Sequence, residues 1–183
     1  MTTRFADVAQ VHQVACPGGD RRQLTFFPEP ISSASVCPDR ALHDGFLYLK
    51  DQGGSEKYQI YYFDQQTGAS VLLTDGVSRN GGVSWSNSGT HFAYYSTGRN
   101  SQDWDVRIME LAPQTQTQTQ TQQQQQQQKV GEIELVTEGG GCWWMPRDWS
   151  PDDKKILVKS YVSAADSSLH VVDIATRTRV KLG

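Results

Sequence analysis

The sequence repeats itself. The segment that starts at Val83 aligns with the segment that starts at Arg147: Trp85 and Trp149 coincide, serine follows each, and turn-forming residues come next. In both segments an apolar run begins seven residues after the tryptophan, and a second run follows a polar loop. Similarity at a fixed spacing is typical of architectures in which one structural unit is stacked on the next.

The period of the repeat is the length of a propeller blade. Copies close on a Leu-Thr or Val-Thr pair, with the threonines at Thr25, Thr74 and Thr137. The second interval is longer than the first because it contains the glutamine tract Gln114–Gln128. Without that tract both intervals are about 46–49 residues, as in propeller blades.

Each period is predicted to contain four short strands. Valine, isoleucine and aromatic residues are concentrated in short runs bounded by turn residues, and no segment has the apolar spacing of a helix. In the copy around Trp85 we expect strands over 82–86, 91–96, 105–111 and 132–137; in the copy before it, over 46–49 and 59–63, after a turn at Asp44-Gly45. A β-sandwich would also fit short strands, but the repeat favours an all-β partial β-propeller of about three four-stranded antiparallel blades.

We expect a single partial propeller domain over residues 1–183. We expect the chain to start inside a blade, because 7–15 and 22–24 resemble late strands without their partners. The remaining blades are therefore expected as missing partners. The predicted units are late strands in 1–30 and blades in 31–76, 77–138 (with a disordered loop 114–128) and 139–183.

Composition excludes several classes of partner and cofactor. The net charge is −3 and basic residues form no run, so we expect neither nucleic acid nor a membrane surface as a partner. The cysteines Cys16, Cys37 and Cys142 are widely spaced, which predicts free thiols and neither a disulfide framework nor a zinc site. With no apolar leader in the first residues, these thiols favour a cytoplasmic location. No cofactor is expected.

No catalytic residue can be identified in this chain. The nearest string to a G-x-S-x-G nucleophile motif is Gly76–Asn80, which lacks the second glycine and precedes a strand. The four histidines do not have metal-ligand spacing, and no phosphate-binding glycine motif occurs. The chain by itself is therefore predicted not to be an enzyme.

Two polar clusters and a tryptophan pair are candidates for a channel or domain interface. Loops at one end of a propeller surround its central channel, where arginines can meet a carboxylate or a partner domain. A solvated turn with a local Arg–Asp pair, or packing of the tryptophans between blades, is the alternative. The candidates are Arg79, Asn80, Arg99, Asn100, Asp103, Trp143 and Trp144.

Several segments resemble the propeller domain of the prolyl oligopeptidase family of serine peptidases, which includes dipeptidyl and acylaminoacyl peptidases. Nearly the whole chain apart from the glutamine tract is covered. The resembling segments are Arg21–Pro30, Arg4–Asp7 with Gln10–His12, Leu72–Gly76, Ser96–Asn100 and Asp148–Asp153. The first two of these are the more specific to the family, whereas the Trp-Ser-Pro-Asp string in the last is shared with other propellers, including the Tol-Pal type.

The resemblance implies a substrate-gating role. Members of the family carry an α/β-hydrolase domain with a Ser-Asp-His triad after the propeller, and the propeller admits only short peptides. None of the triad motifs has a match here, so the hydrolase domain is expected as a missing partner and the parent protein as a serine peptidase. The alternative is a protein-interaction propeller of the WD-repeat or Tol-Pal type; an active propeller such as a glycosidase has no suitable carboxylate pair.

The glutamine tract leads to a first testable prediction. A tract of glutamine and threonine buries no apolar area, and changing the length of a surface loop costs little. Deleting Gln114–Gln128 is therefore expected to leave the melting temperature and the circular dichroism spectrum nearly unchanged. A loss of several degrees would show that the tract is part of the packed structure.

Overall fold

The computed structural model describes residues 1–4, 7–112, 129–136 and 141–183. The predicted glutamine-rich loop and Gly139 and Gly140 lie outside the described residues. None of the described residues lies in a helix, and no helix that could span a membrane is found among them.

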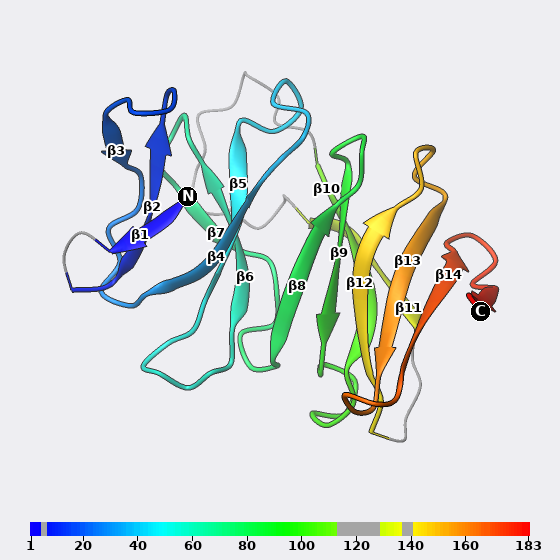
Figure 1. Cartoon of the computed structure of the whole chain (residues 1–183). Helices are drawn as coiled ribbons and strands as arrows, with labels where there is room; N and C mark the ends of the chain where they lie inside the picture. The colour runs from blue at the N-terminus through cyan, green and yellow to red at the C-terminus, as the bar shows by residue number, and fades with distance from the viewer. Residues whose placement is uncertain (5–6, 113–128, 137–140) are drawn as a thin grey trace.

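Four antiparallel sheets follow one another along the chain and lie side by side (Figure 1). In each sheet, strands that are neighbours in sequence are also neighbours in space. The all-β, blade-like architecture predicted from the repeat is confirmed, whereas the division into domains stays a prediction. The sheets are β1 (Thr2–Arg4), β2 (Ala9–Val14) and β3 (Arg21–Gln23); β4 (Ile31–Val36), β5 (Gly45–Lys50), β6 (Gln59–Asp64) and β7 (Ser70–Leu72); β8 (Asn80–Trp85), β9 (His91–Ser96), β10 (Asp105–Leu111) and β11 (Lys129–Val136); and β12 (Trp143–Trp149), β13 (Lys155–Tyr161), β14 (Ser167–Asp173) and β15 (Arg179–Lys181).

Each strand predicted by its residue range overlaps an observed strand, although Thr137, the last residue of the predicted strand 132–137, lies outside the described residues; β1, β4 and β7 were given no predicted range. Strand β4 was not predicted, because its Ser-Ser-Ala-Ser centre has no apolar alternation. The predicted turn at Asp44-Gly45 is wrong at Gly45, which is the first residue of β5. A glycine is required there because a Cβ atom would overlap the Phe63 carbonyl oxygen and the Tyr62 ring.

The carboxylates at the ends of the third strands, β6 and β14, cap the turns to the fourth strands. Asp64 Oδ1 accepts hydrogen bonds from the backbone N–H groups of Gln66 and Thr67, at 2.8 and 3.2 Å. Asp173 Oδ1 accepts one from the N–H of Thr176, at 2.9 Å. The same turn geometry therefore recurs two sheets apart.

Apolar side chains fill the space between successive sheets. The core between β4–β7 and β8–β11 contains Leu47, Ile60 and Phe92, each fully buried. A second core between β8–β11 and β12–β15 is built around Ile108 and Ile156. Strand β4 contacts β8 and β8 contacts β12, so the first strands of successive sheets line one side of the row. This stacking of sheets by their faces is what a propeller requires.

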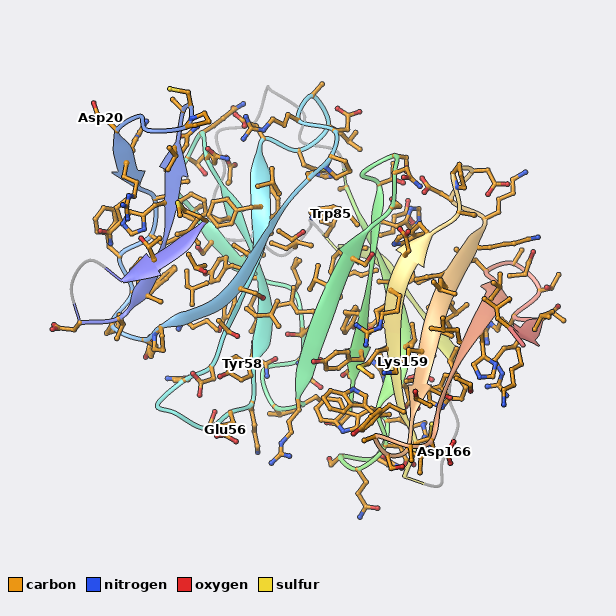
Figure 2. The ribbon with its side chains drawn as sticks, in the orientation of Figure 1. Asp20, Glu56, Tyr58, Trp85, Lys159 and Asp166 are labelled. Atoms are coloured by element: carbon orange, nitrogen blue, oxygen red, sulfur yellow. The ribbon has the colours of Figure 1, made fainter. Side chains whose placement is uncertain are left out.

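The repeated tryptophans join neighbouring sheets by the same hydrogen bond. Trp85 at the end of β8 donates its indole N–H to the carbonyl oxygen of Ser35 on β4, at 3.2 Å. Trp149 at the end of β12 donates to the carbonyl oxygen of Ser84 on β8, at 3.1 Å. Figure 2 shows Trp85 between the two sheets that it connects. A tryptophan at this position thus provides both an apolar face and one directional bond.

The Leu-Thr pairs have a structural role that involves a glutamine partner. Thr74 Oγ1 donates to Gln59 Oε1 at 2.8 Å and accepts from the N–H of Ile60 at 3.1 Å. Thr25 makes the same two bonds with Gln10 and the N–H of Val11, at 2.8 and 2.9 Å. Gln59 begins β6 and Gln10 is the second residue of β2, and each threonine follows the last strand of its sheet. The threonine therefore anchors the chain as it leaves one sheet for the next.

Removing one of these hydroxyl groups leads to a second prediction. Thr74→Ala leaves the N–H of the buried Ile60 and the Gln59 side-chain oxygen each without the hydroxyl partner. The free energy of unfolding is expected to fall by about 1–3 kcal/mol, measured by urea denaturation. Thr74→Ser keeps the hydroxyl and is the matched control. Equal losses in both variants would show that the methyl group, and not the hydrogen bonds, matters.

A histidine is buried beneath Trp85. His43 is 2% exposed, its ring centre lies 5.9 Å from that of Tyr62 and 6.1 Å from that of Trp85, and its Nε2 atom has no hydrogen-bond partner among the described residues. Burial lowers the pKa of His43, and nearby Asp39 opposes this only in part. Folding therefore favours the neutral form of this imidazole.

The buried imidazole leads to a third prediction, on pH. Because the pKa of His43 is lower in the folded chain than its ordinary value of 6.5, the unfolded chain binds more protons at this residue as the pH falls below 6.5. Stability is therefore expected to fall as the pH drops below about 6.5, by at most about 1.4 kcal/mol per pH unit. His43→Phe should flatten this dependence between pH 7 and 5.5, whereas His91→Gln, at a half-buried position, should retain it. An unchanged slope in His43→Phe would contradict the assignment.

Candidate functional site

The candidate residues all lie at one end of the sheets. Strands β8 and β12 begin at this end, the β9–β10 connection turns there, and it is the lower end in Figure 1. Figure 2 shows Glu56 and Asp166, from the β5–β6 and β13–β14 connections, at the same end. We call it the connection end. The topology brings the two predicted polar clusters and the tryptophan pair to one end because antiparallel strands return every second connection there.

The β9–β10 connection is ordered by its own ion pairs. Arg99 Nε lies 2.8 Å and Nη2 3.2 Å from the two carboxylate oxygens of Asp105, which is fully buried, and Nη2 lies 3.1 Å from Asp103 Oδ2. Asn100 Nδ2 donates to the same Asp103 oxygen at 2.8 Å. The Asn100 and Arg99 bonds lower the pKa of Asp103, and Asp105 raises that of Arg99. Three of the predicted residues thus form one network that holds the loop.

Asn80 is mainly structural, whereas Arg79 is available to a partner. The Asn80 side chain is buried and donates to the carbonyl oxygens of Tyr58 and Ser78, at 3.0 and 3.1 Å. The backbone N–H of Arg79 donates to the Thr97 hydroxyl and its carbonyl oxygen accepts from the Thr97 N–H, whereas its side chain is exposed. No carboxylate among the described residues forms an ion pair with its guanidinium group.

The two adjacent tryptophans have different surroundings. Trp143 is half-buried and stacks on Trp104 with ring centres 5.1 Å apart, while Tyr95 meets both rings edge-on at 5.2 Å. Trp144 points into the core against Ile156 and His170, as in the packing alternative. Of the two, Trp143 therefore contributes an accessible aromatic surface at the connection end.

One exposed arginine further along β12 was missed from the sequence. Arg147 occupies a β-bulge between Pro146 and Asp148, where β12 has one residue more than its partner β13, and its side chain is exposed. It lies close enough to Tyr95 to lower the pKa of that phenol, against the larger raising effect of burial. Proline inside a predicted strand is a signal for such a bulge, and bulges re-aim side chains beside functional sites.

The connection end can bind an anionic or aromatic group. Arg79 has an exposed guanidinium group, which suits a carboxylate, and the Trp104–Trp143 stack offers a flat apolar surface. Within the described part of the chain no three His, Cys, Asp or Glu side chains are placed to hold a metal ion. The three cysteines are unpaired: Cys16 is exposed, Cys142 half-buried and Cys37 buried.

Comparison with solved structures identifies the fold. TolB from Acinetobacter baumannii matches with a TM-score of 0.64 and 15% identity, over 95% of this chain and 37% of that one. A putative TolB from Agrobacterium tumefaciens matches with a TM-score of 0.65 and 18% identity, over 96% and 56%. One of two prolyl endopeptidases analysed for inter-domain dynamics matches with a TM-score of 0.67 and 12% identity, over 96% and 26%.

These likenesses show a β-propeller of the kind found in TolB and in prolyl endopeptidases. At such low sequence identity these matches establish the fold alone. The chain spans between about a quarter and just over half of the length of each matched protein. No protein-family model and no curated protein sequence matches this chain.

Proposed function

We propose that this chain is the non-catalytic propeller portion of a prolyl oligopeptidase family serine peptidase, and that its connection end faces the peptidase domain and selects short peptides. The observation that carries the proposal is the exposed arginine Arg79 at the same end of the sheets as the half-buried Trp143, with a second exposed arginine, Arg147, further along β12. Guanidinium groups pair with the carboxylates of a peptide or a partner domain, and the aromatic surface packs against apolar side chains.

Sequence and fold support the same family. The segments Arg21–Pro30 and Arg4–Asp7 resemble the propeller of that family, and a prolyl endopeptidase is among the structural neighbours. The remaining parts of the active enzyme, the hydrolase domain and further blades, would come from outside this chain.

The proposal is tested on the natural protein that contains this chain. Antibodies raised against the chain are used to isolate that protein from cells treated with a fluorophosphonate probe, which labels active-site serines. We expect a labelled polypeptide larger than 20.4 kDa that contains the peptides of this chain. The purified 183-residue chain should remain unlabelled. An unlabelled natural protein, in a lysate whose other serine hydrolases are labelled, would contradict the proposal.

Arg79→Gln in the labelled enzyme tests the connection end. The Michaelis constant for short peptides is expected to rise about two- to five-fold, since exposed ion pairs contribute about 0.2–1 kcal/mol. Hydrolysis of a small uncharged ester should be unaffected. Arg40→Gln, an exposed arginine in the β4–β5 connection at the opposite end, is the matched control. Equal effects of the two substitutions would argue against peptide selection at the connection end.

A second candidate function is a protein-interaction propeller. It is favoured by the two TolB structures, one of which is covered over 56% of its length. In that case the isolated natural protein would remain unlabelled by the fluorophosphonate and would co-purify with a partner protein. Loss of that partner in an Arg79→Gln variant would then place the interaction at the connection end.

A further inference from the structure

One face of the last sheet is apolar and uncovered by the described residues. In β13 and β14, Ile156, Val158 and Val172 point into the core shared with β8–β11, so the alternating residues point the other way. Leu169, Val180 and Leu182 on that other side are 41, 61 and 42% exposed. We call it the free face; it consists of Leu157, Lys159, Leu169, Val171, Val180 and Leu182.

The same positions are buried in the two preceding sheets. The strand registers align Leu157, Leu169 and Val171 with Ala93, Val106 and Ile108 of β8–β11. Those three residues are at most 1% exposed, because the β12–β15 sheet covers them. One sheet earlier, the equivalent Leu47, Ile60 and Tyr62 are likewise buried, beneath the β8–β11 sheet. Each sheet therefore covers this face of the sheet before it.

The free face also includes the backbone carbonyl group that would accept the next hydrogen bond from a tryptophan. The carbonyl groups of Ser35 and Ser84, which accept from Trp85 and Trp149, each belong to the residue just before the end of a first strand. In β12 the equivalent residue is Asp148. The element that covers the free face is thus expected to bring an indole N–H to the Asp148 carbonyl oxygen.

We propose that the free face is the docking surface for one further four-stranded antiparallel sheet, whose first strand ends in a tryptophan that bonds the Asp148 carbonyl. The partner is a blade from outside this chain. A second copy cannot supply it in the same way, because its Trp85 and Trp149 already bond within their own chain and its β1–β3 sheet contains no tryptophan. This inference does not depend on whether the parent protein is a peptidase.

The experiment extends the chain by a copy of one of its own blades. Appending residues 138–183 directly after Gly183 keeps the chain length that separates one sheet from the next, because Leu182 corresponds to Val136. A cysteine reporter, Leu169→Cys, is placed in the first copy only, with Cys16 and both copies of Cys142 changed to serine. Its reaction rate with a maleimide measures whether the free face is covered.

We expect the reporter to react at least about ten-fold more slowly in the extended chain than in the 183-residue chain. Changing the appended tryptophan that corresponds to Trp149 to alanine should restore much of the rate, and changing it to phenylalanine should restore part of it. The control reporter Val77→Cys, at a 68% exposed position, should react equally fast in both chains.

Two results would overturn the proposal. The first is a reporter that stays fully reactive both in this extended chain and in a second one, which appends residues 77–136 with Trp85 as the docking tryptophan. The second is a reporter in the 183-residue chain that becomes protected as the concentration rises, because the free face would then belong to a second copy.

Discussion

Replacing Trp149 by alanine is expected to lower the free energy of unfolding by about 3–5 kcal/mol. The side chain is 8% exposed, packs in the core between β8–β11 and β12–β15, and bonds the Ser84 carbonyl oxygen. Alanine would leave a cavity between the two sheets and remove the bond that joins their first strands. Urea denaturation followed by circular dichroism measures the loss.

Two further variants separate the contributions of the ring and the bond. Trp149→Phe keeps an aromatic face and loses the indole donor, so a smaller loss of about 1–2 kcal/mol is expected. Trp85→Ala removes the equivalent but only half-buried side chain, and should cost less than Trp149→Ala. If Trp149→Ala were as stable as the unmodified chain, the tryptophan would not join the sheets in solution.

Gly45→Ala is expected to destabilise the chain by about 3 kcal/mol or more. The added Cβ would overlap the carbonyl oxygen of Phe63 and the ring of Tyr62, which is fully buried. The carbonyl belongs to β6, which pairs with β5 at this point, so neither group can move without disturbing the sheet. A thermal melt of the purified variant gives the size of the effect.

Gly68→Ala is the matched control for this substitution. Gly68 has a positive φ of 71° and no heavy atom within 4 Å of its would-be Cβ, so only backbone strain of about 1–2 kcal/mol applies. A Gly45→Ala loss no greater than that of Gly68→Ala would show that β5 and β6 can separate at their ends. The double variant Gly45→Ala/Tyr62→Phe should remain destabilised, since the Phe63 carbonyl is still in place.

The sequence was informative wherever a residue has the same structural role in each repeat. Trp85 and Trp149 were recognised as a repeated pair, and they make equivalent bonds to Ser35 and Ser84. The threonines were seen to recur, but their partners Gln10 and Gln59 were not identified, although they share the same spacing. A bond between residues that are 15 positions apart becomes evident only when the third and fourth strands are placed.

The candidate site shows the limits of the same reasoning. Arg99 and Asp103 were grouped correctly as a cluster, but the buried Asp105 that Arg99 binds lies in a strand and carries no motif. Arg147 was overlooked because its exposure results from a bulge, which depends on how β12 pairs with β13. Trp143 and Trp144 are neighbours in sequence, yet alternation along β12 sends one to the connection end and the other into the core.

By itself the sequence determined that the chain is built from repeated short strands with a tryptophan at corresponding positions, because periodicity and turn residues are local properties. Only the tertiary structure decided which faces are covered. Leu47, Ala93 and Leu157 occupy equivalent strand positions, but the first two are fully buried and Leu157 lies on the free face. The physical reason is that burial depends on the neighbouring sheet, and a residue's own strand holds no information about whether that sheet is present.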